Sequence, residues 1–201
     1  MADGDTLYRP GPADSRQLAA LYRLAAGGVA DYLWSDLAED GEDILDAGAR
    51  RFARPGEDVS FENCIAAASI GAGGDEDQDD GVMAGMVLAF PMREMTDLPP
   101  DFDPVLRPYA ELEQVPSLYI CGIAVHSAYQ GRGIGRKLLD AAGAHYANAG
   151  LPAHSLIAFE ENTGAVRLYE RLGYEIVGRR AVVPHPFIQY AGDALLMVRA
   201  I

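Results

Sequence analysis

The sequence predicts a mixed α/β domain. Two stretches with helical spacing of apolar residues come first, and a group of short apolar runs typical of strands follows them. In the second half of the chain, strand-like and helix-like segments alternate, which is the pattern of an α/β fold. The 201 residues, 49% of them hydrophobic, suffice for one core, so we expect residues 1–201 to form a single domain.

The N-terminal part of the chain is expected to be helical. Leucines and Tyr22 recur at helical spacing within Asp14–Ala26, and a Gly-Gly pair follows as a stop signal. A second helical stretch covers Val29–Phe52 and breaks near Gly41.

Three apolar runs then predict a meander of strands at Phe61–Ser69, Val82–Phe90 and Leu118–Val125. The acidic segment Gly71–Gly81 reads as a solvated hairpin loop between the first two strands. Pro91–Pro116 is rich in proline, and so long a connection in a compact domain is usually a binding loop or an insertion.

The remaining elements alternate. We expect a helix at Arg136–Asn148, a strand at Ser155–Phe159, a helix at Gly164–Leu172 that ends on Gly173, and strands at Glu175–Val183 and Ala194–Arg199.

Charge and composition exclude several classes of function. A formal net charge of −14 disfavours nucleic acid and better suits a cationic partner. No run of residues reaches the apolar length of a membrane span, and the first residues lack the apolar core of a secretory signal. We therefore expect a cytoplasmic protein without membrane or nucleic-acid partners. A single lysine among many arginines and alanines indicates a GC-rich, bacterial genome.

Cysteine and histidine usage argues against a metal site. Cys64 and Cys121 both lie in predicted strands, where buried thiols are expected rather than a disulfide or a nucleophile. The four histidines are scattered without the spacing of a zinc site, so we expect no metal.

A glycine-rich turn carries the strongest functional signal. The segment Gln130-Gly131-Arg132-Gly133-Ile134-Gly135-Arg136 joins the predicted strand Leu118–Val125 to the following helix. The first turn of a helix presents unpaired N–H groups and partial positive charge, and glycines let the backbone wrap around a phosphate. Arg132, Arg136 and Lys137 can add charge-assisted contacts. The spacing matches neither the dinucleotide fingerprint nor the G-x-x-x-x-G-K-[ST] loop, which disfavours a nucleotide-binding domain.

Two motifs together resemble the GCN5-related N-acetyltransferase (GNAT) superfamily. Gln130, Gly133 and Gly135 fit its [QR]-x-x-G-x-[GA] turn. Asn162 and Tyr169, seven residues apart, fit the asparagine and tyrosine of its next helix, which closes on a leucine–glycine–aromatic turn. The resemblance is clear from Leu118 to Val183.

The resemblance implies a fold and a reaction. The fold is a mostly antiparallel sheet with helices on both faces and a parallel strand pair that splays apart to bind acyl-CoA. Acetyl-CoA would be the co-substrate, and an amine of a small molecule or protein would attack it directly. Tyr169 would protonate the departing thiolate or donate a hydrogen bond to it, although it could also be only an aromatic residue of the core. The implied cofactor-binding residues are Ile123, Ala124, Val125, Gln130, Gly131, Arg132, Gly133, Ile134, Gly135, Arg136 and Asn162.

The general base is the open question at this stage. Many relatives carry a glutamate on the strand that corresponds to Leu118–Val125, and this strand has no carboxylate. Glu113, just before the strand, and His185, in a proline-flanked loop, are the candidates, and Glu111 is an alternative to Glu113. A related acyl-CoA-sensing module without turnover is the competing hypothesis.

The acceptor pocket is expected to draw on the N-terminal helices, the Pro91–Pro116 loop and the Pro184–Gly192 loop. The middle loop is acidic, which motivates the hypothesis of a cationic acceptor. Edge strands near the C-terminus would allow a homodimer. The acidic residues of the middle loop are Glu94, Asp97, Asp101, Asp103, Glu111 and Glu113.

Overall fold

The computed structural model describes residues 5–69, 82–95 and 97–201. The predicted loop Gly71–Gly81 lies outside these residues. The strands are β1 (Asp5–Tyr8), β2 (Cys64–Ser69), β3 (Met83–Met92), β4 (Ser117–Val125), β5 (Ala153–Phe159), β6 (Glu175–Ala181) and β7 (Asp193–Ala200). The helices are α1 (Ser15–Ala25), α2 (Val29–Ser35), α3 (Ile44–Phe52), α4 (Arg107–Ala110), α5 (Ile134–His145) and α6 (Thr163–Arg171).

Within the described residues, the seven strands form one sheet in the order β1-β2-β3-β4-β5-β7-β6. Neighbouring strands run antiparallel except β4 and β5, which are parallel. This confirms the mixed, mostly antiparallel sheet with one parallel pair. The edge strands are β1 and β6, and β6 has the more exposed side chains of the two.

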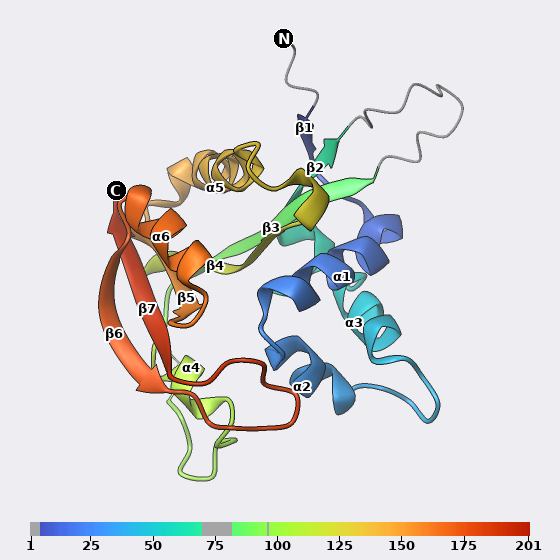
Figure 1. Ribbon diagram of the computed structural model, residues 1–201, viewed down its shortest axis with the longest axis vertical. Coiled ribbons are helices and arrows are strands. Elements are labelled where there is room, and N and C mark those ends of the chain that lie inside the picture. The colour runs from blue at the N-terminus through green and yellow to red at the C-terminus, as the bar shows by residue number, and fades with distance from the viewer. Residues whose placement is uncertain (1–4, 70–81, 96) are drawn as a thin grey trace.

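Helices cover both faces of the sheet (Figure 1). Side chains of α5 and α6 form one core cluster with the strands, and side chains of α1 and α3 form a second cluster on the opposite face. Strand β3 lies between them: Val87 belongs to the first cluster, while Met86 and Leu88 belong to the second. Burial on both faces explains why β3 reads as a continuous apolar run instead of an alternating one.

Most predicted elements are confirmed, and two were not expected. The stretch Val29–Phe52 divides into α2 and α3, with the predicted break between them. Strand β1 was missed because it has only four residues and no clear apolar alternation. Helix α4, a single turn inside the proline-rich connection, was also missed. Both cysteines are free thiols, Cys64 buried and Cys121 half-buried. Among the described residues, no helix is long and apolar enough to cross a membrane.

Candidate active site

The parallel strands β4 and β5 separate halfway along their length. They pair only from Leu118 to Ile120 on β4 and from His154 to Leu156 on β5. Beyond these residues, Ile123, Ala124 and Val125 pair with β3 on one side and have no strand partner on the β5 side. The predicted splay is therefore present, and it exposes the β4 edge to any extended ligand that adds as a strand.

A β-bulge lies where the two strands part. In the pairing of β3 with β4, Leu88 faces Gly122 and Ala89 faces Ile120, so Cys121 is the extra residue. A bulge bends its strand and increases the local twist. Gly122 is needed here, because a Cβ at this position would lie 2.8 Å from the Tyr22 ring of α1. The packing of α1 thus supports the bend that opens the gap.

The glycine-rich turn forms the start of α5, next to the end of β4. Gly131 and Gly133 have φ values of 78° and 81°, in the left-handed region that favours glycine. A Cβ on either residue would meet no atom within 4 Å, so the space in front of the turn is open. Gln130 donates from Nε2 to the carbonyl oxygen of Val125 at 3.0 Å, which ties the turn to β4.

The first turn of α5 has no side-chain cap. Its leading N–H groups therefore lack intrahelical partners and point out of the helix end. Arg132 lies 5.1 Å from the Tyr129 ring centroid, and exposed Arg136 pairs with Asp140 at 3.5 Å. Ile134 is buried in the core, so only its backbone faces the turn. An uncapped helix end flanked by glycines and arginines is suited to a phosphate group.

Helix α6 is capped by Asn162. Its Oδ1 accepts a hydrogen bond from the backbone N–H of Ala165 at 3.2 Å. The resemblance implies that Asn162 either contacts the pantetheine or orders the strand–helix turn, and this hydrogen bond is of the second kind. Gly135 of α5 lies close to α6, because a Cβ on it would be 3.7 Å from Leu168 Cδ2.

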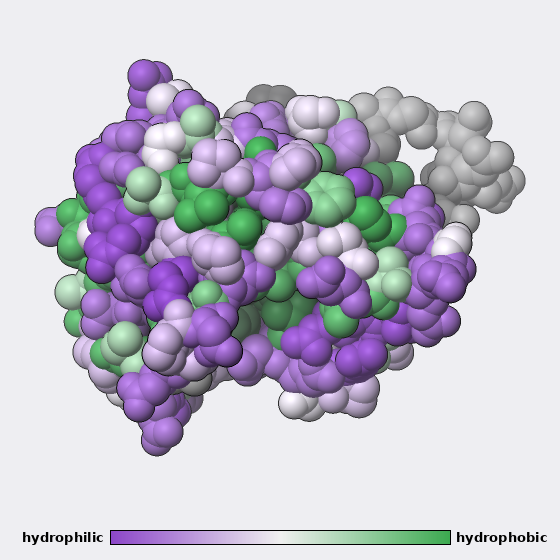
Figure 2. Space-filling model, turned by 90° about the horizontal axis from the view of Figure 1, so that it is seen from below, coloured by the Kyte–Doolittle hydropathy of each residue, from purple (hydrophilic) through white to green (hydrophobic). Residues whose placement is uncertain are grey.

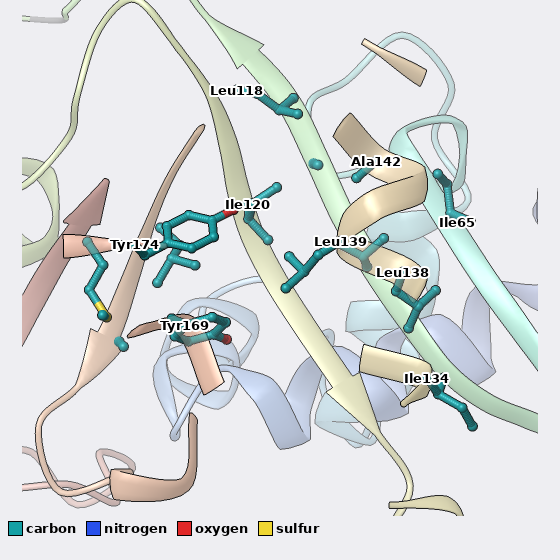
Figure 3. Close-up of a cluster of buried hydrophobic side chains, with 14 of the residues drawn as sticks. Ile65, Leu118, Ile120, Ile134, Leu138, Leu139, Ala142, Tyr169 and Tyr174 are labelled. Carbon is teal, nitrogen blue, oxygen red and sulfur yellow. The ribbon is translucent and has the colours of Figure 1, made fainter. Parts of the chain in front are cut away.

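Tyr169 projects from α6 into the core beside β4. In the view of Figure 3, its ring lies to one side of the β4 ribbon and Leu138 and Leu139 of α5 lie to the other, and all three belong to the same core cluster. Its ring contacts Tyr174 with centroids 5.9 Å apart, and the residue is 8% exposed. Burial raises the pKa of the Tyr169 hydroxyl above its usual range. The hydroxyl therefore stays protonated at neutral pH and can donate a hydrogen bond or a proton.

Glu113 and Glu111 lie in different environments. Glu111 pairs with Arg180, Nε to Oε2 at 2.8 Å, and this contact holds it at β6. Glu113 has no ion pair among the described residues, and burial raises the pKa of its carboxyl group. Its charge also raises the pKa values of Tyr119 and Cys121, in addition to the larger effect of burial. Glu113 is therefore within electrostatic range of the bulge of β4, and Glu111 is otherwise engaged.

The three segments expected at the acceptor pocket do meet. The Tyr32 hydroxyl of α2 donates to Asp103 Oδ2 at 2.7 Å, and the Tyr32 ring packs edge-on against His185 with centroids 4.6 Å apart. All three side chains are half-buried. The hydrogen bond from Tyr32 is the largest cause that lowers the pKa of Asp103. Figure 2 views this end of the molecule and shows apolar side chains in a hollow with a hydrophilic rim.

Close packing joins the α1–α2 turn to the loop between β6 and β7. The backbone N–H of Gln189 donates to the carbonyl oxygen of Gly27 at 2.9 Å. Gly28 has a φ of 95°, and a Cβ on it would lie 1.9 Å from the carbonyl oxygen of Phe187. The Gly-Gly pair, predicted only as a helix stop, also admits the loop that carries His185.

The predicted residues thus divide into two groups. The residues of β4, the turn and α6 gather around the gap, and Glu113 lies near the bulge. His185 contacts Tyr32 and Phe187, and neither Tyr169 nor Glu113 is among its partners in the described residues. Tyr32 could be core or pocket wall from the sequence, and core is preferred because aromatic residues at helical spacing usually pack in the core. In the structure, Tyr32 instead contacts Asp103 and His185. Within the described ranges, no three His, Cys, Asp or Glu residues cluster as a metal site.

Comparisons with known proteins agree with this geometry. The model of the Acetyltransferase (GNAT) family matches residues 34–174, well over half of the chain. A search of curated proteins found no match.

Solved structures show the same fold at low identity. A mutant agmatine N-acetyltransferase is 14% identical with a TM-score of 0.63, over 99% of this chain and 100% of that one. An N-acetyltransferase from Staphylococcus aureus Mu50 is 17% identical with a TM-score of 0.58, over 96% and 99% of the two chains. A chain of the NatC complex bound to Gag peptide and CoA is 18% identical with a TM-score of 0.58, over 98% of each. The chain belongs to the acetyltransferase (GNAT) family and is an N-acetyltransferase.

Proposed function

We propose that the protein transfers an acetyl group from acetyl-CoA directly to an amine, preferentially a small cationic one. One observation carries the cofactor assignment: β4 and β5 part beside an uncapped, glycine-flanked helix end. An extended arm can add to the free edge of β4 while a pyrophosphate occupies the open space before Gly131 and Gly133. The residues present therefore fit acyl-CoA.

Acetyl-CoA supplies the acetyl group as an activated thioester. The backbone of Ile123, Ala124 and Val125 binds the pantetheine arm, and an amide near Ile123 polarises the acetyl carbonyl. The turn from Gln130 to Arg136 holds the pyrophosphate, and Asn162 orders the start of α6 beside it.

Proton transfer needs a base and an acid on either side of the reacting atoms. A protonated amine loses a proton before it attacks, and Glu113, directly or through water, accepts it. Its raised pKa improves the match between the base and a neutral working pH. Tyr169, kept neutral by burial, donates to the departing sulfur. No acyl-enzyme is needed, and the half-buried Cys121 has a pKa raised to about 11 by burial, which argues against a thiolate nucleophile.

A cationic acceptor is favoured by Asp103 and its neighbours. The carboxylate accepts from the N–H groups of Val105 and Leu106 and from the Tyr32 hydroxyl, so it is held ionised in one orientation. The rings of Tyr32 and His185 lie beside it. A carboxylate among aromatic rings is a suitable site for an ammonium or guanidinium group. The amines of a small molecule and of a basic peptide share this chemistry.

Thermal unfolding with and without acetyl-CoA tests the cofactor. A ligand at 100 times its dissociation constant adds about 2.7 kcal/mol. For a domain of this size, the midpoint then rises by roughly 5–11 °C. No rise at millimolar acetyl-CoA, CoA or longer acyl-CoAs would contradict the proposal.

Acceptor preference and catalytic roles need turnover measurements. We expect di- and polyamines to be acetylated with a higher kcat/KM than neutral amino acids, and Asp103→Asn to remove this preference mainly through KM. Tyr169→Phe should lower kcat and leave CoA affinity nearly intact. Equal rates with neutral amino acids would refute the cationic acceptor, and full activity of Tyr169→Phe would make that tyrosine structural.

A further inference from the structure

A second cavity lies away from the gap, over the paired halves of β4 and β5. Its volume is about 440 Å³, within the range of small-molecule sites. One wall is the C-terminal half of α5 with Gly143, and the opposite wall is the end of β7 with Arg199. Leu118 and Leu151 contribute apolar surface. The cavity shares no lining residue with the glycine-rich turn or the parted ends of the strands, so it is separate from the acetyl-CoA site.

His154 lines this cavity, and one of its ring nitrogens has no hydrogen-bond partner among the described residues. The side chain is only 5% exposed, and its Nδ1 lies 2.9 Å from Nη2 of Arg199. Because a guanidinium group only donates, Nδ1 is the acceptor and the proton of the neutral ring is on Nε2. Burial and, secondarily, Arg199 lower the pKa of His154 to about 4, so this neutral form persists at physiological pH. No acceptor among the described residues is hydrogen-bonded to Nε2.

Gly143 makes room for the imidazole ring. A Cβ at this position would lie 2.8 Å from Cε1 and 3.5 Å from Nε2 of His154. Any larger residue at position 143 would press against the edge of the His154 ring that carries the Nε2–H group. The Nε2–H group has no hydrogen-bond partner among the described residues, so it is free to donate to an acceptor in the cavity.

Arg199 supplies the charge. Its guanidinium group lies 5.2 Å from the ring centroid of Tyr174 and donates to the carbonyl oxygen of Leu172 at 3.4 Å. No carboxylate pairs with it in the part of the chain that the structure describes, although most arginines here have acidic partners. The nearby carboxylate of Asp140 pairs with Arg136 instead. A half-buried arginine without a carboxylate partner among the described residues and a neutral histidine N–H therefore line one side of the cavity.

We propose that this cavity binds a small carboxylate with an apolar chain. The carboxylate oxygens accept from His154 Nε2 and from Arg199, and the chain lies against Leu118 and Leu151. The negative end of the α5 dipole and Asp140 occupy the opposite wall, so the carboxylate faces β7. This site is independent of acetyl-CoA binding.

Hexanoate is a suitable probe, with hexylamine of the same chain length as the control for charge. In the full-length protein, hexanoate should raise the unfolding midpoint saturably and shift the ¹⁵N imidazole resonances of His154 but not those of the other three histidines. Arg199→Met should weaken hexanoate binding at least tenfold. Because Arg199 also packs on Tyr174, a second variant is needed that leaves the polar groups intact.

Ala147→Phe provides this variant, since Ala147 is an exposed rim residue of the cavity. The larger ring should block the mouth and abolish the hexanoate response. Ala144→Phe is the matched control, because Ala144 is exposed on α5 and does not line the cavity. An absent response in the wild type, a response that survives Ala147→Phe, or saturable binding of hexylamine in place of hexanoate would each overturn the proposal.

Discussion

Adding one methyl group to Gly133 separates its role in phosphate binding from its role in the backbone. Gly133 has a φ of 81°, and Gly41, in the loop between α2 and α3, has the same φ. A Cβ would meet no atom within 4 Å at either position. Gly133→Ala and Gly41→Ala therefore impose the same backbone strain, and they differ in that only Gly133 faces the proposed pyrophosphate position.

The expected magnitudes follow from this match. A left-handed conformation costs a non-glycine residue about 1–2 kcal/mol, so both variants should lose that much stability. For a domain of this size, each kcal/mol lowers the midpoint by about 2–4 °C. Hydrogen bonds to charged groups contribute about 1.5–3 kcal/mol each. Loss of one pyrophosphate contact in Gly133→Ala should therefore weaken CoA binding roughly 10- to 150-fold.

Isothermal titration calorimetry with CoA, below the unfolding range of both variants, measures the difference. Gly41→Ala should bind CoA like the wild type, and Gly133→Glu should not bind it at all. If Gly133→Ala and Gly41→Ala bound CoA equally well, the turn would not be the phosphate site.

Three further changes test other parts of the site. In the wild type, kcat/KM should fall on the acidic side as Glu113 takes up a proton, at a pH above the ordinary glutamate pKa of 4.5. Glu113→Gln should lower kcat and flatten this acidic limb of the profile. Because burial raises the pKa of Glu113, ionisation of its carboxyl group destabilises the fold as pH rises. Glu113→Gln should therefore unfold at a higher temperature than the wild type at pH 7 and lose this advantage below pH 4.5. A variant less stable than the wild type at pH 7 would contradict this. Asn162→Ala should lower the free energy of unfolding in denaturant by about 1 kcal/mol through loss of the α6 cap, whereas Asn162→Asp should keep the cap. If both variants bound CoA more weakly than the wild type, the Asn162 amide would contact the cofactor. Gly28→Ala should lower stability by roughly 2–5 kcal/mol, since strain at a φ of 95° adds to overlap with Phe187. Gly56→Ala, at a φ of 75° with open space, should lower stability by only about 1–2 kcal/mol. Equal losses of stability in the two variants would refute the packing argument.

The sequence predicted the elements whose pattern is local. Two local motifs predict strand–helix turns, one at Gln130–Gly135 and one at Asn162 with Tyr169. Both turns are present in the structure. The edge strand β1 escaped prediction because its four residues owe their conformation to pairing with β2. Long-range pairing of this kind leaves no periodic signal in the strand itself.

The parts of the candidate site that follow from a local motif could be predicted from the sequence, and the parts that depend on long-range contacts could not. The phosphate turn depends on glycine spacing, which a sequence displays directly. The bulge at Cys121 depends on the register between β3 and β4, and the meeting of Tyr32, Asp103 and His185 depends on loops far apart in the chain. The distinction between Glu111 and Glu113 arises from Arg180, sixty-nine residues after Glu111, and no local pattern indicates that pairing.

The contact between Gly28 and Phe187 also limits how the enzyme could acquire new substrates. Two walls of the proposed acceptor region, the α1–α2 turn and the loop between β6 and β7, touch through backbone atoms at Gly28 and Phe187 and at Gly27 and Gln189. A sequence change that reshapes one wall must be accompanied by a change in the other, which makes single-step variation there improbable. The 93–106 segment carries no such backbone contact to either wall in the described residues, so divergence in acceptor preference among close relatives should concentrate in that segment.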